Sequence, residues 1–195
     1  KYGDTTKMAW GKNGIKTLSS NGTSIDVTGL SNNKFNQILS SMEANTSTLN
    51  PYSFINDEAG ANYATRFNTN GGTDAVQQGV NYGNYTGLGT LPTPYFLVDY
   101  LAVIGTEEKL GIRHAVIQDT AGAGTAPFRT EVVYKVVNAD ALSSFKWTGG
   151  DFSTDDQVVV LGSDAASLTV QDGAIFHETD TNKSYVLSSN TWTEL

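Results

Sequence analysis

The chain has 195 residues, of which 38% are hydrophobic and only 16% are charged. It contains no cysteine, which excludes a disulfide framework and a thiolate zinc site. The net charge of -8, with lysine and arginine scattered singly, argues against a nucleic-acid partner, because phosphate binding needs clustered basic side chains. No apolar run approaches the roughly 18 residues of a membrane helix. We therefore expect a soluble protein with no membrane partner, built from short strands and tight turns.

The chain opens with a polar segment, Lys1–Gly14, that shows no periodicity and is predicted to be an arm. Such an arm becomes ordered only where another surface holds it, and we expect a partner subunit to do so. Two strands are expected next, at Ile15–Leu18 and Ser24–Val27, separated by a turn at Asn21 and Gly22.

Ser31–Ala44 is the one stretch with a helical pattern. Its apolar residues recur at i, i+3, i+4 and i+7 behind Ser31 as a candidate N-cap. These residues are Phe35, Ile38, Leu39 and Met42. The stretch carries little Ala or Glu, so a strand with Phe35 and Leu39 on one face is the alternative, and both interpretations stay open.

The following segments are predicted to form consecutive hairpins. Tyr52–Asn56 and Tyr63–Phe67 are short strands that flank a turn at Asp57–Gly60, and Asn70–Gly72 makes a second turn. Asp74–Pro94 has few large aliphatic residues and several glycines, which is typical of a long exposed loop. Loops of this kind often carry binding sites.

Three tyrosines lie on or beside this predicted loop: Tyr82, Tyr85 and Tyr95. Tyrosine offers a large ring with a polar tip, so the cluster is a candidate ligand or docking surface, for a sugar or for a protein. The alternative is that these rings pack the loop on the core.

The centre of the chain has the clearest β pattern, with three half-buried antiparallel strands. In the first, the residues that share one face are Phe96, Val98, Tyr100, Ala102 and Ile104. The second has Leu110, Ile112, His114 and Val116 in phase. In the third, Phe128, Val132, Tyr134 and Val136 share a face, whereas Arg129, Glu131 and Lys135 face away.

A Gly-rich loop at Ala121–Pro127 precedes the third of these strands, and two further strands are expected at Ser144–Trp147 and Gln157–Leu161. Strands at such regular spacing predict an antiparallel β-sandwich of jelly-roll type over residues 15–163. Residues 164–195 are predicted to form a small meander that cannot bury much core alone. Its expected strands are Leu168–Val170, Ala174–Glu178, Ser184–Leu187 and Thr191–Leu195. We expect this C-terminal module to dock on the sandwich or on a neighbouring subunit.

Parts of the chain resemble structural proteins of tailed phages and related viruses. The stretches concerned are Phe54–Phe67 with Gly71–Asp74, and Lys109–Asn138 with Gly150–Phe152 and Val160–Ser163. The C-terminal phrase Gly173–Leu187, followed by Asn190–Leu195, is similar to a small β module common in phage fibre and decoration proteins. The resemblance implies a trimeric jelly-roll-like domain on a capsid or tail, and thus a place at the virion surface.

Catalytic machinery is not expected from these residues. The Gly-x-Ser-x-Gly elbow of serine hydrolases is absent. The carboxylate pairs Glu107-Glu108 and Asp155-Asp156 are interpreted as solvated charge in loops or on opposite faces.

Metal and cofactor sites are not expected either. His114 is in phase with apolar neighbours and is interpreted as a core or subunit-interface histidine. His177 lies beside acidic residues, but two histidines in the whole chain are poor material for a zinc site. The acidic loops Asp57-Glu58 and Asp151–Asp156 lack the spacing of a calcium loop and are interpreted as turns.

These patterns lead us to expect a non-enzymatic virion structural protein that decorates a capsid or forms part of a fibre. One alternative is a receptor- or glycan-binding fibre domain whose partner is a host-surface glycan, and another is a glycan-degrading enzyme. We also expect a homo-oligomer, most simply a trimer, in contact with other virion proteins of the capsid or tail. The reason is that the N-terminal arm and the C-terminal module both need an external surface.

Overall fold

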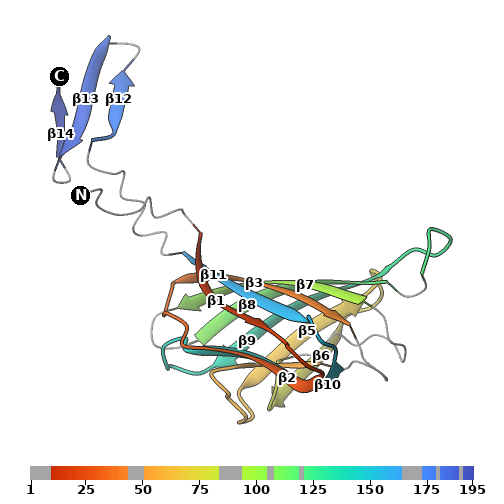
Figure 1. Ribbon diagram of the computed structural model, residues 1–195. Coiled ribbons are helices and arrows are strands. Elements are labelled where there is room, and N and C mark those ends of the chain that lie inside the picture. Colours follow the sequence, from red (N-terminus) through yellow and green to blue (C-terminus); the bar gives the residue numbers. More distant parts are fainter. Residues whose placement is uncertain are drawn as a thin grey trace. The chain divides into compact units, whose positions relative to one another are not determined.

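The computed structural model describes residues 10–43, 51–83, 94–104, 108–118, 121–163, 173–178, 181–188 and 191–195. In this part of the chain all regular structure is antiparallel β (Figure 1). The chain divides into two compact units, of which Trp10–Ser163 forms one and the last three strands lie in the other. The predicted all-β fold with an antiparallel β-sandwich is confirmed.

The sandwich consists of a large sheet and a small sheet. The large sheet has eight strands in the order β1-β11-β3-β7-β8-β9-β5-β6, and the small sheet has three in the order β2-β10-β4. The large sheet comprises β1 (Gly11–Thr17), β3 (Phe35–Glu43), β5 (Tyr63–Thr69), β6 (Ala75–Val80), β7 (Pro94–Ile104), β8 (Glu108–Ile117), β9 (Phe128–Val137) and β11 (Gln157–Ser163). The small sheet comprises β2 (Gly22–Thr28), β4 (Tyr52–Ile55) and β10 (Ser144–Phe152).

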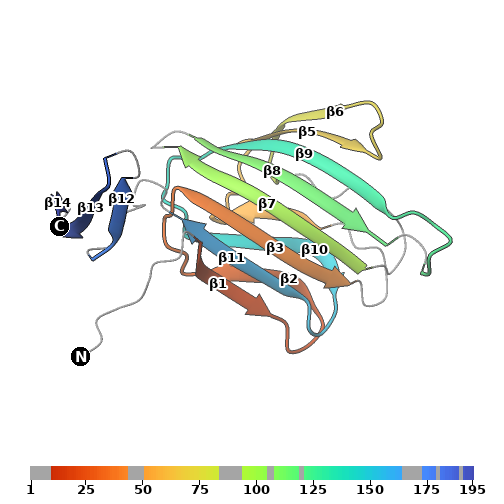
Figure 2. The same ribbon diagram turned by 90° about the horizontal axis from the view of Figure 1, so that it is seen from above.

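The small sheet lies against one face of the large sheet, which we call the inner face (Figures 1 and 2). Hydrogen bonds between side chains join the two sheets. Trp147 Nε1 on β10 donates to Ser40 Oγ on β3 at 2.9 Å. Arg113 Nη2 on β8 donates to Ser53 Oγ on β4 at 2.8 Å. Buried hydrophobic side chains fill the space between the sheets, with Trp147 and Phe145 fully buried among them.

Ser31–Ala44 contains a strand, so the helical interpretation of this stretch is wrong and the strand alternative is right. β3 is hydrogen-bonded on both sides, to β11 and to β7. Its apolar residues divide between the faces: Ile38 and Met42 are buried, whereas Phe35 and Leu39 are only partly buried on the opposite face. Pairing with two neighbouring strands overrides the local helical period.

The predicted hairpin between Tyr52–Asn56 and Tyr63–Phe67 is not formed. β4 pairs with β10 in the small sheet, and β5 pairs with β6 and β9 in the large sheet. Asn56 and Asp57 have φ of 57° and 51°, in the left-handed region that asparagine and aspartate tolerate. This turn therefore carries the chain from one sheet to the other. The second predicted turn is confirmed, because Asn70 and Gly71 join β5 to β6.

Two segments predicted to lack strands contain them. The end of the predicted N-terminal arm belongs to β1, which pairs with β11 from Gly11 onward. Ala75–Val80, in the predicted long loop, forms β6 at one edge of the large sheet. Residues 84–93 of that loop and residues 1–9 of the arm lie outside the described residues.

The last three described strands form a small antiparallel sheet. They are β12 (Ile175–Glu178), β13 (Lys183–Ser188) and β14 (Thr191–Glu194), in the order β12-β13-β14. The strand predictions for residues 174–195 are therefore confirmed, whereas Leu168–Val170 lies outside the described residues. Leu187 is buried in this sheet, whereas Ile175, Trp192 and Leu195 are exposed.

Candidate interaction surface

The face of the large sheet opposite the small sheet is apolar, which is unusual for a sheet face that no described strand covers. On β7, Leu97 and Leu101 point to the core, and the alternate residues Phe96 and Tyr100 are half exposed. Antiparallel sheets commonly have one face on the core and one polar face in solvent. This sheet instead has apolar residues on both faces.

We define the outer face by the exposed large hydrophobic residues of the large sheet, each between 43% and 50% exposed. They are Ile15, Val76, Phe96, Tyr100, Ile104, Leu110, Ile112, Val116, Val133 and Val137. The strand register places many of them side by side, for example Tyr100 opposite Ile112 and Ile112 opposite Val133. Figure 2 shows this face from above, with β2 and β10 behind it. Continuous apolar patches of this kind mark interaction sites.

The outer face is hollowed by a groove of about 730 Å³. Residues from β3, β5, β6, β7, β8 and β9 line it, together with Trp10 just before β1. Its charged lining residues are Arg66 and Lys135, and its described lining contains no carboxylate. The groove therefore offers area for apolar contact and no pair of acidic side chains for acid–base chemistry.

Charged residues lie toward the β9 and β5 side of the outer face and are paired with one another. Lys135 Nζ lies 2.9 Å from Glu108 Oε1, and Arg66 Nη1 lies 3.2 Å from Asp74 Oδ2. A third, longer pair joins Arg129 to Glu131 at 3.7 Å. Paired charges thus lie among and beside the apolar residues on this side of the outer face.

His114 lies on this outer face, opposite Val98 on β7 and Glu131 on β9. It is exposed, so the core interpretation of His114 is wrong, and the alternative interpretation as a subunit-interface histidine stays a prediction. The residues of β7 that were predicted to share one face do share it, and this is the outer face. Alternation identifies residues that share a face but does not say which of two apolar faces is covered.

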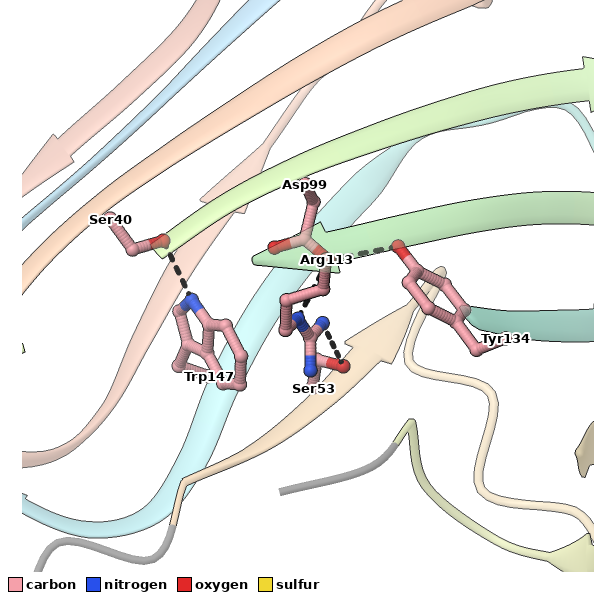
Figure 3. A network of polar contacts seen from close by, with 6 residues as sticks. All are labelled: Ser40, Ser53, Asp99, Arg113, Tyr134 and Trp147. Atoms are coloured by element: carbon pink, nitrogen blue, oxygen red, sulfur yellow. Dashed lines mark hydrogen bonds and ion pairs between the residues drawn. The ribbon is translucent and has the colours of Figure 1, made fainter. Parts of the chain in front are cut away.

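Beneath the outer face, on the core side of the same strands, lies a buried polar network (Figure 3). Arg113 Nε on β8 donates to Asp99 Oδ1 on β7 at 2.8 Å, and both side chains are fully buried. The Tyr134 hydroxyl on β9 donates to the same oxygen at 3.0 Å. The Arg113 guanidinium also lies over the Trp147 ring, 4.4 Å from its centroid. With the bond to Ser53, the network ties three strands of the large sheet to the small sheet.

The protonation states of the network follow from its burial and its charges. Burial opposes the charge on Arg113, but Asp99 and Tyr134 raise its pKa overall. Burial and the nearby Asp99 carboxylate raise the pKa of Tyr134 well above its ordinary value. Arg113 therefore stays charged and Tyr134 neutral. Because Asp99 and Arg113 are inaccessible to solvent, the network is suited to holding the sheets together and not to acting on a substrate.

A second buried cation holds a loop beside the same strand. Lys109 Nζ on β8 donates to the carbonyl oxygens of Asn138 and Asp140, at 2.7 Å each. Burial lowers the pKa of Lys109, and the nearby Asp140 and Glu58 partly offset this.

An acidic side chain of a turn also bonds to the backbone. Asp156 accepts hydrogen bonds from the Glu43 and Ser153 N–H groups. This use of Asp156 agrees with the interpretation of its loop as a turn, whereas the interpretation of Asp156 as solvated charge is wrong, because its side chain is buried.

The three tyrosines singled out from the sequence lie in different environments. Tyr95 is 2% exposed and points into the core, so its ring is not available at a surface. Tyr82 is partly buried and packs on Tyr52, with ring centroids 4.4 Å apart. Tyr85 lies outside the described residues, and a ligand surface that includes it stays a prediction.

Sequence reasoning missed both the buried network and the outer face. A signal for the network exists, because Asp99 interrupts the apolar run Phe96–Val103 and Arg113 lies on the next strand.

His177, which was considered as a metal ligand, is exposed, and its Nδ1 lies 3.0 Å from Ser184 Oγ. Within the described ranges no three acidic, cysteine or histidine side chains lie close enough together to hold a metal ion.

Comparison with protein-family models, with curated proteins and with solved structures finds no match to this chain. The described part of the chain contains no helix that is long and apolar enough to cross a membrane.

Proposed function

We propose that this chain is a non-enzymatic structural protein, which is held in a larger assembly through its outer face. The observation that supports this most is the apolar character of that face, with ten large hydrophobic side chains half exposed. Such an area is costly to leave in water, and covering it favours association. An assembly protein has a use for such a face, whereas a free-standing monomer does not.

The strand order supports a jelly-roll arrangement, which we include in the proposal. β1 and β3 flank β11 in the large sheet, while β2 and β4 flank β10 in the small sheet. The first four strands thus alternate between the two sheets and pair with the last two strands of the sandwich. Nested pairing of this kind is expected when a long hairpin is folded over into two sheets, as in the jelly rolls of viral capsid and lectin domains.

The setting that we propose is the virion surface, on a capsid or a fibre. This setting rests on the resemblance of Phe54–Phe67 and of the C-terminal phrase to phage structural proteins. A glycan-binding role has less support on the outer face, because recognition of a sugar needs several polar groups and the groove lining is dominated by apolar side chains.

Electron microscopy of virus particles that carry this chain tests the proposal. Antibodies raised against residues 10–163 should label the capsid or fibre surface. In a reconstitution with particles that lack the chain, the wild-type protein should bind, whereas Ile112→Lys, in the centre of the outer face, should not. Ser24→Lys on the small sheet is the matched control and should bind normally. The proposal would be contradicted if the antibodies labelled no particle, or if Ile112→Lys bound to the particles as well as the wild type does.

A further inference from the structure

We propose that the occupant of the outer face is the outer face of a second copy of this chain, so that two sandwiches pack with their large sheets together. This inference rests on the proposed function and names the partner. It is carried by the width, the area and the charge of the face.

The width of the face excludes a narrow occupant. The exposed hydrophobic residues lie on β1, β6, β7, β8 and β9, so that Ile15 on β1 and Val76 on β6 stand at the two edges of the large sheet. With neighbouring strands about 4.8 Å apart, the width of the large sheet from β1 to β6 is on the order of 30 Å. A helix, about 10 Å in diameter, or one extended segment would leave most of the face exposed. Another sheet face has the required width, and sheets pack face to face through interdigitating side chains.

The area of the face matches what a stable pair needs. Ten large side chains, each nearly half exposed, together offer on the order of 700 Å² of apolar surface. A specific interface of standard size buries about 800 Å² per partner. Tyr100 and Trp10 provide aromatic rings at the groove, the kind of side chain that contributes most to binding.

The charge of the face also favours a second copy. The chain carries a net charge of -8, so two copies repel each other over most of their surfaces. The three ion pairs of the outer face do not add to this repulsion, because each joins one cation to one anion. The cations are Arg66, Arg129 and Lys135. These pairs therefore add little net charge to the face, which lessens the repulsion between two copies that approach through it.

A two-fold axis makes such a contact self-limiting. When the same face is used on both copies, each contact occurs twice and the pair closes, so no filament grows from it.

Sedimentation velocity and thiol labelling of the full chain test this proposal together. The wild-type chain should sediment with twice the monomer mass, or a multiple of that, and Ser24→Lys should not change this. Ile112→Lys should halve the mass, and its melting temperature should match that of the wild type at a dilution where the wild type is also monomeric, because Ile112 is half exposed in the isolated sandwich.

Because the chain has no cysteine, a single introduced thiol reports on one position. Val133→Cys, on the outer face, should react with a maleimide at least about tenfold more slowly than Ser24→Cys, and dilution or the added Ile112→Lys change should remove the protection. A monomeric wild type with a freely reactive Cys variant would overturn the second copy as occupant. The proposed structural function would still be tested by the particle experiment. Binding to particles in that experiment would mean that a different virion protein covers the outer face. An oligomer that is unchanged by Ile112→Lys would also overturn the proposal, because it would use another surface.

Discussion

Arg113 on β8 and Asp99 on β7 face each other across the pairing of these strands, joined at 2.8 Å with no exposure of either side chain. Removing the cation would leave a carboxylate buried without its partner. We expect Arg113→Met to lower the free energy of unfolding by about 3–5 kcal/mol. Urea denaturation followed by tryptophan fluorescence measures this, since Trp147 is fully buried next to Arg113, whereas Trp10 and Trp192 are exposed. The exposed pair is the control, because Lys135→Met should cost only about 0–1 kcal/mol. Equal losses in the two variants would show that burial of the pair has no effect.

Gly111 has no side chain, and the Tyr134 ring occupies the space where a Cβ would lie. A Cβ at this position would overlap the ring, which is held by its hydrogen bond to Asp99. We expect Gly111→Ala to lower the free energy of unfolding by about 1–3 kcal/mol, through displacement of the ring. Gly124 has open space around its Cβ position, so Gly124→Ala should change stability little. Thermal unfolding of both variants is sufficient, and a neutral Gly111→Ala would mean that Tyr134 can move at no cost.

Asp156 should make stability depend on pH. Burial raises its pKa from 3.8 to about 6, and the hydrogen bonds from Glu43 and Ser153 offset this only in part. Between these two values the folded state binds more protons than the unfolded state, so this residue's contribution to stability is present below the lower value and is lost as the pH rises through about 6. Melting temperatures from about pH 4 to about pH 7 should therefore fall more steeply for the wild type than for Asp156→Asn. Identical slopes would rule out a raised pKa for Asp156.

Loss of Lys109 should destabilise one loop more than the sandwich as a whole. Its ammonium group donates to two carbonyl oxygens in residues 138–140, and Lys109→Met would leave both without this donor. We expect a loss of about 1–3 kcal/mol in the free energy of unfolding. Hydrogen exchange should also become faster at residues 138–142 than in the wild type. A uniform change across all strands would instead indicate a general loss of packing.

The strands of this fold are largely readable from the sequence, because alternation and turn residues are local properties. β9 shows why one face could also be assigned: Val132 and Val136 alternate with charged Glu131 and Lys135, so only one side suits the core. β7 has apolar residues at nearly every position, and its pattern cannot tell Leu97 from Phe96. Such a strand reveals its covered face only when its neighbours are known.

The candidate surface could not be derived for the same reason. It depends on which strands are neighbours in the large sheet, and pairings such as that of β11 with β3 join residues far apart in the chain. The buried network has a clearer local signal, since a charged residue such as Asp99 within an apolar run demands a partner. Its partners Arg113 and Tyr134 become evident once β7, β8 and β9 are placed side by side.

The nested strand pairing has a consequence for how the chain folds as it is synthesised. Among the strands that the structure describes, β1 pairs only with β11, and β2 and β4 pair only with β10. These three early strands must therefore wait until Ser144–Phe152 and Gln157–Ser163 have left the ribosome. Contacts between such distant segments make folding slow, and unpaired strand edges favour aggregation in the meantime. The meander β7-β8-β9, whose strands follow one another directly, can form first and present a template on which both ends of the sandwich close.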